Sequence, residues 1–197
     1  ALGFRDENDV PVNQNLPYTY SDHLVAGLEY VPTPALRLTL ESFYKRYGDY
    51  LVSARDGLSL ANQGGDFGII GNEKLNSSGT GESYGFELFA QQKLTKNLFF
   101  VGAYTLFWSK FSNADGQLSP SAWDNRHLLS LTLGRKFRRN WEIGLKYRFQ
   151  GGVPFTPFDL EASQRNYATV GRGIPDLTRL NSERLNNFSQ LDFRIDK

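Results

Sequence analysis

The sequence predicts an all-β protein: an antiparallel up-and-down transmembrane β-barrel, here a partial barrel of about seven strands. Three observations predict it. Apolar and polar residues alternate with a period of two, short connections alternate with long ones, and aromatic residues gather near the ends of the expected strands. The composition agrees, because 15 Phe, 10 Tyr, 3 Trp and 19 Gly favour strands and turns over helices.

The first two expected strands show the alternation most simply. In His23–Val31 every second residue from Leu24 to Tyr30 is apolar. In Leu36–Tyr47, "LRLTLESFYKRY", leucines occupy one face while Arg, Thr, Glu and Lys occupy the other. A period of two is typical of a strand and not of a helix.

The next two expected strands differ in how clearly they assign their faces. In Glu82–Lys93, "ESYGFELFAQQK", Tyr, Phe, Leu and Ala oppose Ser, Gly, Glu and Gln. Leu98–Lys110 is apolar on both faces, so the alternation leaves its register open.

The last three expected strands alternate again. They are Arg126–Phe137, whose leucines alternate with Ser, Thr and Gly, then Trp141–Gln150, "WEIGLKYRFQ", and Ser189–Lys197, "SQLDFRIDK". Across the set, we expect Leu38, Leu40, Phe86, Leu145 and Tyr147 to face lipid.

The connections alternate between short and long. "PTPA", "LTKN" and "RRN" are tight, whereas Gly48–Gly81, Phe111–Asn125 and Gly151–Phe188 are long and rich in Gly, Asn, Ser, Asp and Pro. Since each strand reverses the chain direction, all short turns fall at one end of the sheet and all long loops at the other. This asymmetry is typical of outer-membrane barrels and rare in compact soluble domains.

A membrane setting is compatible with the apolar runs. The best one, "LFFVGAYTLFW", has 11 residues, whereas a spanning helix needs about 20 and a tilted strand about 9–11. Alternation alone leaves open a soluble ligand-binding β-barrel with its apolar face inside. The loop asymmetry favours the membrane, as do aromatic residues placed like interface girdles: Tyr30, Tyr44, Trp108, Trp141, Tyr147 and Phe149.

Charge and cysteine content exclude some chemistry. Lys and Arg number 22 against 21 Asp and Glu, which is no nucleic-acid footprint, and the absence of Cys excludes disulfides and thiolate metal sites. The basic cluster "RKFRRN", Arg135–Asn140, lies at a short turn. Contact with anionic lipid headgroups explains it better than nucleic-acid binding does.

The stretch "WDNRHLLSLTLGRKF" begins with candidate chemical residues. Asp124, Arg126 and His127 lie where a long loop re-enters the expected barrel. An Asp/His dyad, a Ser/His pair or a zinc site would need partners, and the other histidine is His23, also at this rim. We interpret the three as structural residues of the extracellular rim, and expect no enzyme, no catalytic or metal site and no cofactor.

Two further patterns have plain structural interpretations. The glycines of "NQGGDFGIIG", residues 62–71, lack the Lys-Ser/Thr of a phosphate loop and indicate a flexible loop. Charged residues on the polar faces are lumen-facing candidates for substrate contact, or a charge ladder that solvates the lumen or grips a plug: Arg37, Glu41, Lys45, Glu87, Glu142, Lys146 and Arg148.

Three stretches in order carry a family resemblance. "GESYGFELFAQQKLTKNLFFVGAYTL", "WDNRHLLSLTLGRKFRRNWEIGLKYRFQGGVPFTP" and "RLNNFSQLDFRIDK" resemble the C-terminal barrel region of TonB-dependent outer-membrane receptors. The matching features are the Asp-x-Arg-His strand start after a loop and the Gly-Gly-x-Pro-aromatic-Thr-Pro turn at Gly151–Pro157. The likeness covers about Ser21 to Lys197.

The resemblance implies a bacterial outer-membrane receptor of about 22 strands around an N-terminal plug domain. It implies energised uptake of a bulky nutrient such as a siderophore, cobalamin or glycan, driven by an inner-membrane energy-coupling protein. We expect residues 1–197 to be a segment of one β-barrel domain, with the plug and final strands absent. A passive porin-like or adhesive outer-membrane barrel is the alternative beside the soluble barrel.

Overall fold

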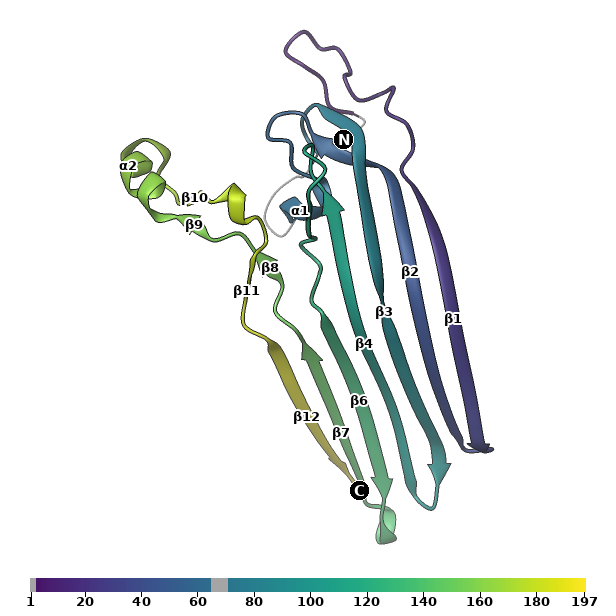
Figure 1. Cartoon of the computed structure of the whole chain (residues 1–197). Helices are drawn as coiled ribbons and strands as arrows, with labels where there is room; N and C mark the ends of the chain where they lie inside the picture. Colours follow the sequence, from purple (N-terminus) through teal and green to yellow (C-terminus); the bar gives the residue numbers. More distant parts are fainter. Residues whose placement is uncertain (1–2, 65–70) are drawn as a thin grey trace.

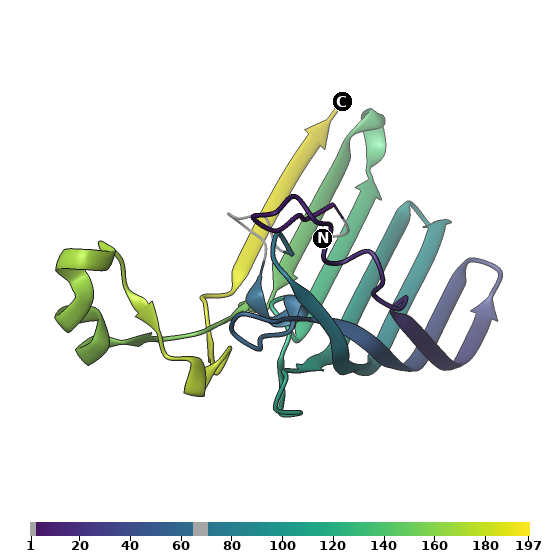
Figure 2. The ribbon, with the colours of Figure 1, turned by 90° about the horizontal axis from the view of Figure 1, so that it is seen from above.

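One antiparallel sheet dominates the computed structural model, which describes residues 3–64 and 71–197. Its long strands pair in chain order, β1-β2-β3-β4-β6-β7-β12, and the short β5 adds to β4. Figure 2 shows an open, curved sheet in which β1 and β12 do not meet. The strands are β1 Tyr20–Thr33, β2 Leu36–Ser53, β3 Leu75–Thr95, β4 Leu98–Ser112, β5 Leu118–Pro120, β6 His127–Lys136, β7 Glu142–Gln150 and β12 Phe188–Asp196.

The seven predicted strands are confirmed as the seven long strands of this sheet, but the predicted loop Gly48–Gly81 is too long. β2 continues to Ser53, and β3 already begins at Leu75. The register of this pair shifts between Tyr47 and Tyr50, and Asp49, with φ 51°, lies at the shift. A bulge of this kind moves later side chains to the opposite face, so a strict period of two stops being visible there.

The short turns have the backbone that their sequences demand. Lys96 and Asn97 link β3 to β4 with φ 49° and 65°, the two positive values of the hairpin turn whose twist matches its strands. The "RRN" turn forms a one-turn helix, η1, over Arg138–Asn140, with φ 62° at Arg139 and 61° at Asn140. Both turns lie at the same end of the sheet (Figure 1).

The register of the strands places the apolar side chains of neighbouring strands side by side on a single face of the sheet. Leu40 pairs with Leu28 and Leu88, which pairs with Tyr104, and the pairing continues to Leu129. The same register resolves β4, whose faces the alternation left open. Its even-numbered residues from Phe100 to Trp108 share the apolar face, while its odd-numbered residues share the charged one.

Within residues 3–64 and 71–197, no segment forms a layer over the apolar face. Leu28 is 74% exposed and Leu191 63%, although a soluble sheet would bury such residues in a core. The buried apolar residues lie instead at the long-loop end: Val52, Leu60, Ala61, Leu75 and Phe111. None of the described helices has the length and apolar character to cross a membrane.

The long-loop end contains structure that the sequence pattern did not predict. The chain between β7 and β12, residues 151–187, projects as an arm (Figure 1). Its helix α2, Leu160–Val170, begins at Asp159, whose side chain accepts from the Ala162 amide, and ends at Gly171 with φ 66°. The remaining short elements are α1 Leu60–Gln63, β8 Pro154–Phe155, β9 Phe158–Asp159, β10 Ile174–Pro175, η2 Leu177–Arg179 and β11 Glu183–Arg184.

Candidate functional site: the loop rim and the charged face

A buried carboxylate joins the arm to the rim of the sheet. Asp124 is fully buried, and its oxygens accept from the Ser109 amide at 3.2 Å, from Arg126 at 3.2 Å and from Arg184 at 3.2 Å. Arg184 also donates to the Asp124 carbonyl and, at 3.0 Å, to the Gly152 carbonyl. A charge removed from water in this way is stable because it is paired and hydrogen-bonded.

Two residues close to Asp124 in the chain, Arg126 and His127, contact aromatic rings on the apolar face of the sheet. Arg126 has φ 65°, and its guanidinium lies 5.1 Å from the centre of the Trp108 ring. His127 Nδ1 lies 2.8 Å from the Tyr104 hydroxyl, and the two rings stack. Trp108 itself stacks on Tyr84 at 5.4 Å. The predicted rim residues therefore come together, each with a structural partner.

The Gly-Gly pair after β7 allows the arm to leave the sheet close to its neighbours. A Cβ on Gly151 would collide with the Asn125 carbonyl oxygen, and one on Gly152 would collide with the Leu185 carbonyl oxygen. Asn125 Nδ2 also donates to the Gly151 carbonyl at 3.0 Å. Only glycine fits this close approach of three backbone segments.

A second buried residue, Asn181, joins three loops. Its Nδ2 donates to the Asn62 carbonyl at 2.9 Å and to the Pro120 carbonyl at 2.8 Å. Asn62 in turn donates from its own Nδ2 to the Phe111 carbonyl at 2.9 Å. Such side-chain to backbone bonds replace regular pairing where loops are buried.

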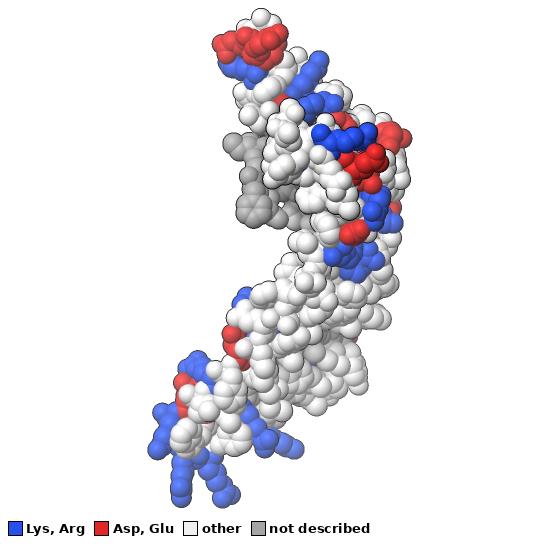
Figure 3. All heavy atoms as spheres, turned by 90° about the vertical axis from the view of Figure 1, so that its left-hand side faces the viewer, with Lys and Arg blue, Asp and Glu red and all other residues white. Residues whose placement is uncertain are grey.

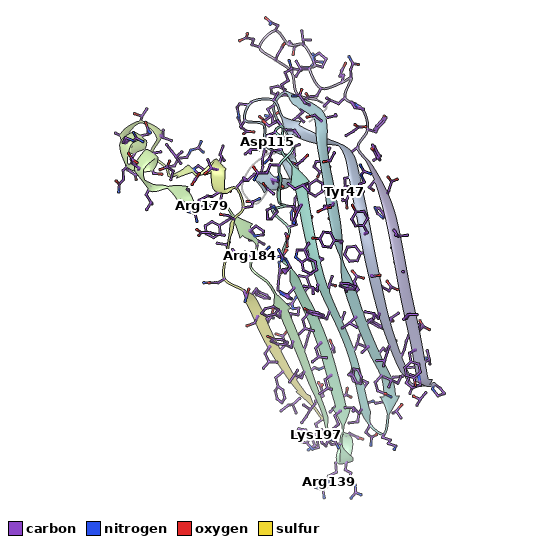
Figure 4. The ribbon with its side chains drawn as sticks, viewed as in Figure 1. Tyr47, Asp115, Arg139, Arg179, Arg184 and Lys197 are labelled. Atoms are coloured by element: carbon purple, nitrogen blue, oxygen red, sulfur yellow. The ribbon has the colours of Figure 1, made fainter. Side chains whose placement is uncertain are left out.

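Two hollows lie between the arm and the neighbouring loops. One, of about 630 Å³, is lined by Arg55, Arg172 and apolar residues such as Phe155. The other, of about 700 Å³, is lined by Asp56, Asp115 and Arg179. Figure 4 places Arg184 at the base of the arm and Arg179 farther out along it. Arginines therefore line both hollows at the long-loop end, together with Asp56 in each and Asp115 in the second.

Asp56 is held in its charged form within this loop layer. Burial by itself would raise its pKa, but a hydrogen bond from the Leu58 backbone amide, together with Ser53 and Arg55, lowers the pKa of Asp56 below its ordinary value. The Leu58 amide donates at 3.0 Å. This carboxylate therefore fixes the turn that follows β2.

The lumen-facing candidates share the charged face of the sheet. Arg37 pairs with Glu29 at 2.5 Å, Glu142 lies 3.8 Å from Lys136, and Arg148 donates to Gln190 at 2.5 Å. Lys146 lies opposite Asp192, and Lys45 opposite Ser83.

Glu41 and Glu87 lie directly opposite one another in the register of β2 and β3. Like charges in this arrangement destabilise a strand pair unless a cation compensates them. Neither carboxylate has a salt bridge within the described residues. The centre of the charged face therefore presents an unneutralised pair of acids.

The structure keeps the two histidines apart, so they do not share one site. His23 lies on β1 and His127 on β6, with three strands between them, which separates them by about 19 Å at the usual strand spacing. His23 Nε2 lies 2.9 Å from the Ser21 hydroxyl. Among residues 3–64 and 71–197, no three His, Asp or Glu side chains form a group that could hold a metal ion. The centre of the predicted flexible glycine stretch, residues 65–70, lies outside the described residues.

An antiparallel sheet with one exposed apolar face, one charged face, short turns at one end and long anchored loops at the other defines a segment of an outer-membrane β-barrel wall. The family model described as "TonB dependent receptor-like, beta-barrel" matches residues 3–195. The chain therefore belongs to the TonB-dependent receptor β-barrel family and is a bacterial outer-membrane protein. The soluble-barrel alternative is wrong.

Solved structures of similar fold include two receptors and an iron transporter. The ferric-catecholate import receptor Fiu of E. coli K12 superposes with a TM-score of 0.64 at 14% identity, covering 99% of this chain and 23% of that chain. The pyoverdine receptor FpvA of Pseudomonas aeruginosa PAO1, bound to pyoverdine, gives 0.60 at 15%, covering 98% and 25%. The FrpB iron transporter of Neisseria meningitidis gives 0.57 at 15%, covering 91% and 24%.

At 14–15% sequence identity, the similarity to these solved structures establishes the fold alone. The chain spans about a quarter of the length of these solved structures. No curated protein gives a sequence match.

Sequence reasoning missed Arg184, Asn181 and Asn62, which make the long-range contacts of the rim. Arg184 lies 60 residues from Asp124 in the chain, and no local pattern links them. The one sequence signal was the Gly-Gly-x-Pro stretch, because consecutive glycines next to a strand indicate close backbone approach.

Proposed function

We propose that this chain forms part of the barrel of an outer-membrane receptor that takes up a bulky nutrient with energy supplied from the inner membrane. The observation that carries the proposal is the seven-strand wall with its lipid-type apolar face, in a chain that belongs to the TonB-dependent receptor family. Residues 1–197 are then one segment of a single β-barrel domain. The barrel gives passage, and the loops capture the ligand.

In this proposal the long loops are extracellular and the short turns periplasmic. The support is the sorting of loop lengths by end, since outer-membrane barrels have short periplasmic turns and longer extracellular loops. The buried Asp124 and Asn181 connections would then hold the extracellular loops in one arrangement over the barrel mouth.

The ligand class that we propose is a ferric siderophore, ahead of cobalamin or a glycan. Fiu is a ferric-catecholate import receptor, and FpvA binds pyoverdine. In this chain, Arg55, Arg172 and Arg179 line the hollows at the loop end. Arginines are suited to bind anionic oxygen donors such as those of a ferric chelate.

The partners that we propose are a plug domain inside the barrel and an inner-membrane energy-coupling protein. Glu41 and Glu87 support the first, because adjacent carboxylates on the charged face need a cation from another segment. A Lys or Arg of the plug would supply it. The other lumen-facing charges would line the remaining contact with the plug or the substrate.

The experiment measures uptake of labelled ferric siderophores, cobalamin and glycans by cells that express the whole protein. We expect uptake of a ferric siderophore, its loss on adding a protonophore, and a reduction in the Arg55→Gln, Arg172→Gln double variant. Arg165→Gln is the matched control, because Arg165 lies on α2 and pairs with Glu161. Uptake that persists with the protonophore would indicate a passive porin-like barrel and contradict the proposal.

A further inference from the structure

Basic side chains gather at the short-turn end of the β6–β7 hairpin. Figure 3 shows Lys and Arg at this lower end, below a span that carries few charges. Figure 4 shows Arg139 at the tip of the turn and Lys197 beside it. The basic end consists of Arg135, Lys136, Arg138, Arg139 and Lys197, all of them exposed.

Part of the basic end lies on the apolar face, not on the charged one. Arg135 pairs with Leu98 on one side and Ile143 on the other, in the row that faces lipid. Its guanidinium lies 5.3 Å from the centre of the Phe137 ring, and Lys197 Nζ lies 5.4 Å from that of Trp141. Cations beside outward aromatic rings are typical of the membrane interface, where the ring lies among headgroups and the charge reaches the polar layer.

The basic end is largely without compensating acids. Lys136 lies 3.8 Å from Glu142, but within the described chain Arg135, Arg138 and Arg139 make no salt bridge. Glu142 and Asp196 lie in the same register row as Lys136. That row is on the charged face and is therefore turned away from lipid. The outward cations thus lack an anionic partner in the part of the chain that the structure describes.

We propose that the basic end binds the phosphate groups of anionic glycerophospholipids in the leaflet at the short-turn end. Guanidinium groups hydrogen-bond phosphate oxygens in pairs, and here they lie at two levels, Arg135 along the strand and Arg138 and Arg139 at the tip. The neighbouring Phe137 and Trp141 rings would contact the acyl chains just below the headgroup. The inference rests on the proposed orientation, which places this end in the phospholipid leaflet that faces the periplasm.

The test uses fluorescence quenching of Trp141 in the whole protein, reconstituted into phosphatidylcholine vesicles in a background where Trp141 is the sole tryptophan. Brominated phosphatidylglycerol and brominated phosphatidylcholine are compared as quenchers. We expect phosphatidylglycerol to associate at least about fivefold more strongly, because one basic residue near an anionic surface contributes a factor of about that size. Added salt should reduce the preference.

Charge variants distinguish binding of an anionic lipid at the basic end from non-specific contact of the protein with the bilayer. Arg135→Gln, Arg138→Gln and Arg139→Gln together should reduce the preference severalfold, whereas lysine at the same three positions should retain it. The matched control neutralises Arg165, Arg172 and Arg179 on the arm, with the same change in net charge, and should leave the preference intact. Circular dichroism of each variant verifies the folded barrel.

An equal association of both lipids with the folded parent protein would overturn the inference, and so would a preference that is undiminished in the triple glutamine variant. The orientation is tested separately with Asn140→Cys on intact cells. Labelling of this cysteine from outside would contradict the proposed function's topology, whereas protection of the cysteine without lipid preference would overturn the lipid inference alone.

Discussion

Asp124 shows what one buried side chain contributes to the rim. It is fully buried and holds Arg126 and Arg184, which come from different loops. We predict that Asp124→Asn destabilises the arm by about 1.5–3 kcal/mol, the usual contribution of hydrogen bonds to charged groups. Protease cleavage within the arm would measure the effect. Asp115→Asn, at an exposed loop position, is the control, and equal sensitivity of both variants would contradict the assignment.

Asp56 gives the rim a defined dependence on pH. Because the pKa of Asp56 is lowered in the folded state, its contribution is fully present above the unfolded value of about 4 and is lost as pH falls through the folded pKa. We predict that Asp56→Asn lowers stability by up to about 1 kcal/mol at neutral pH. Thermal unfolding of both proteins across pH measures this. The difference should vanish in acid, and a difference that is constant down to strongly acidic pH would refute the assignment.

Sequence patterns predicted the residues of the sheet well and those of the rim poorly. Leu40 and Glu41 could be assigned to opposite faces because alternation is a local property. Asp124 was recognised, but its partner Arg184 was not, since a contact between two loops leaves no periodic trace. The fully buried Asn13, which binds the backbone of Leu75 and Glu73, was missed for the same reason.

At the scale of elements, a charged substitution on the apolar face of β2 tests whether that face contacts lipid. Leu40 lies in the middle of β2 and is 43% exposed. We predict that Leu40→Arg costs about 2–4 kcal/mol of folding free energy in lipid vesicles, as arginine does near the bilayer midplane. Thr39→Arg, one residue away on the charged face, should cost far less. Similar losses in the two variants would contradict the assignment of faces.

The junction of β7 with the arm depends on a residue without a side chain. A Cβ at Gly152 would overlap the Leu185 carbonyl, whereas at Gly144 the nearest atom, the Arg194 Cβ, is 3.7 Å away. We predict that Gly152→Ala costs about 1–3 kcal/mol through overpacking, and that Gly144→Ala is tolerated. Chemical unfolding of the two variants measures the difference, and an unperturbed Gly152→Ala protein would show that the backbones at Gly152 and Leu185 do not approach as described.

Element prediction failed where the chain leaves strict periodicity. The bulge at Asp49 concealed the last residues of β2. Helix α2 was not predicted, although Asp159 and Gly171 are good capping residues. Its eleven residues are exposed or half-buried, so it has no core-facing stripe of the kind that makes a helix visible in sequence.

At the scale of the whole molecule, the structure is a wall and not a closed domain. β1 and β12 each pair along one edge only, and most of the buried residues lie at the long-loop end. The sheet therefore separates its two environments by face, with lipid on one side and a polar lumen on the other. Loop length and anchoring distinguish its two ends in the same way.

The most direct test of this account is the side of the membrane on which each end lies. The chain has no native cysteine, so single cysteines at Ala114, Ala168 and Asn140, all exposed positions, can be treated with a membrane-impermeant thiol reagent on intact cells. We predict reaction at Ala114 and Ala168, and at Asn140 only after the outer membrane is opened. Reaction at Asn140 with none at Ala168 would invert the topology, and equal reaction at all three on intact cells would contradict a membrane-spanning sheet.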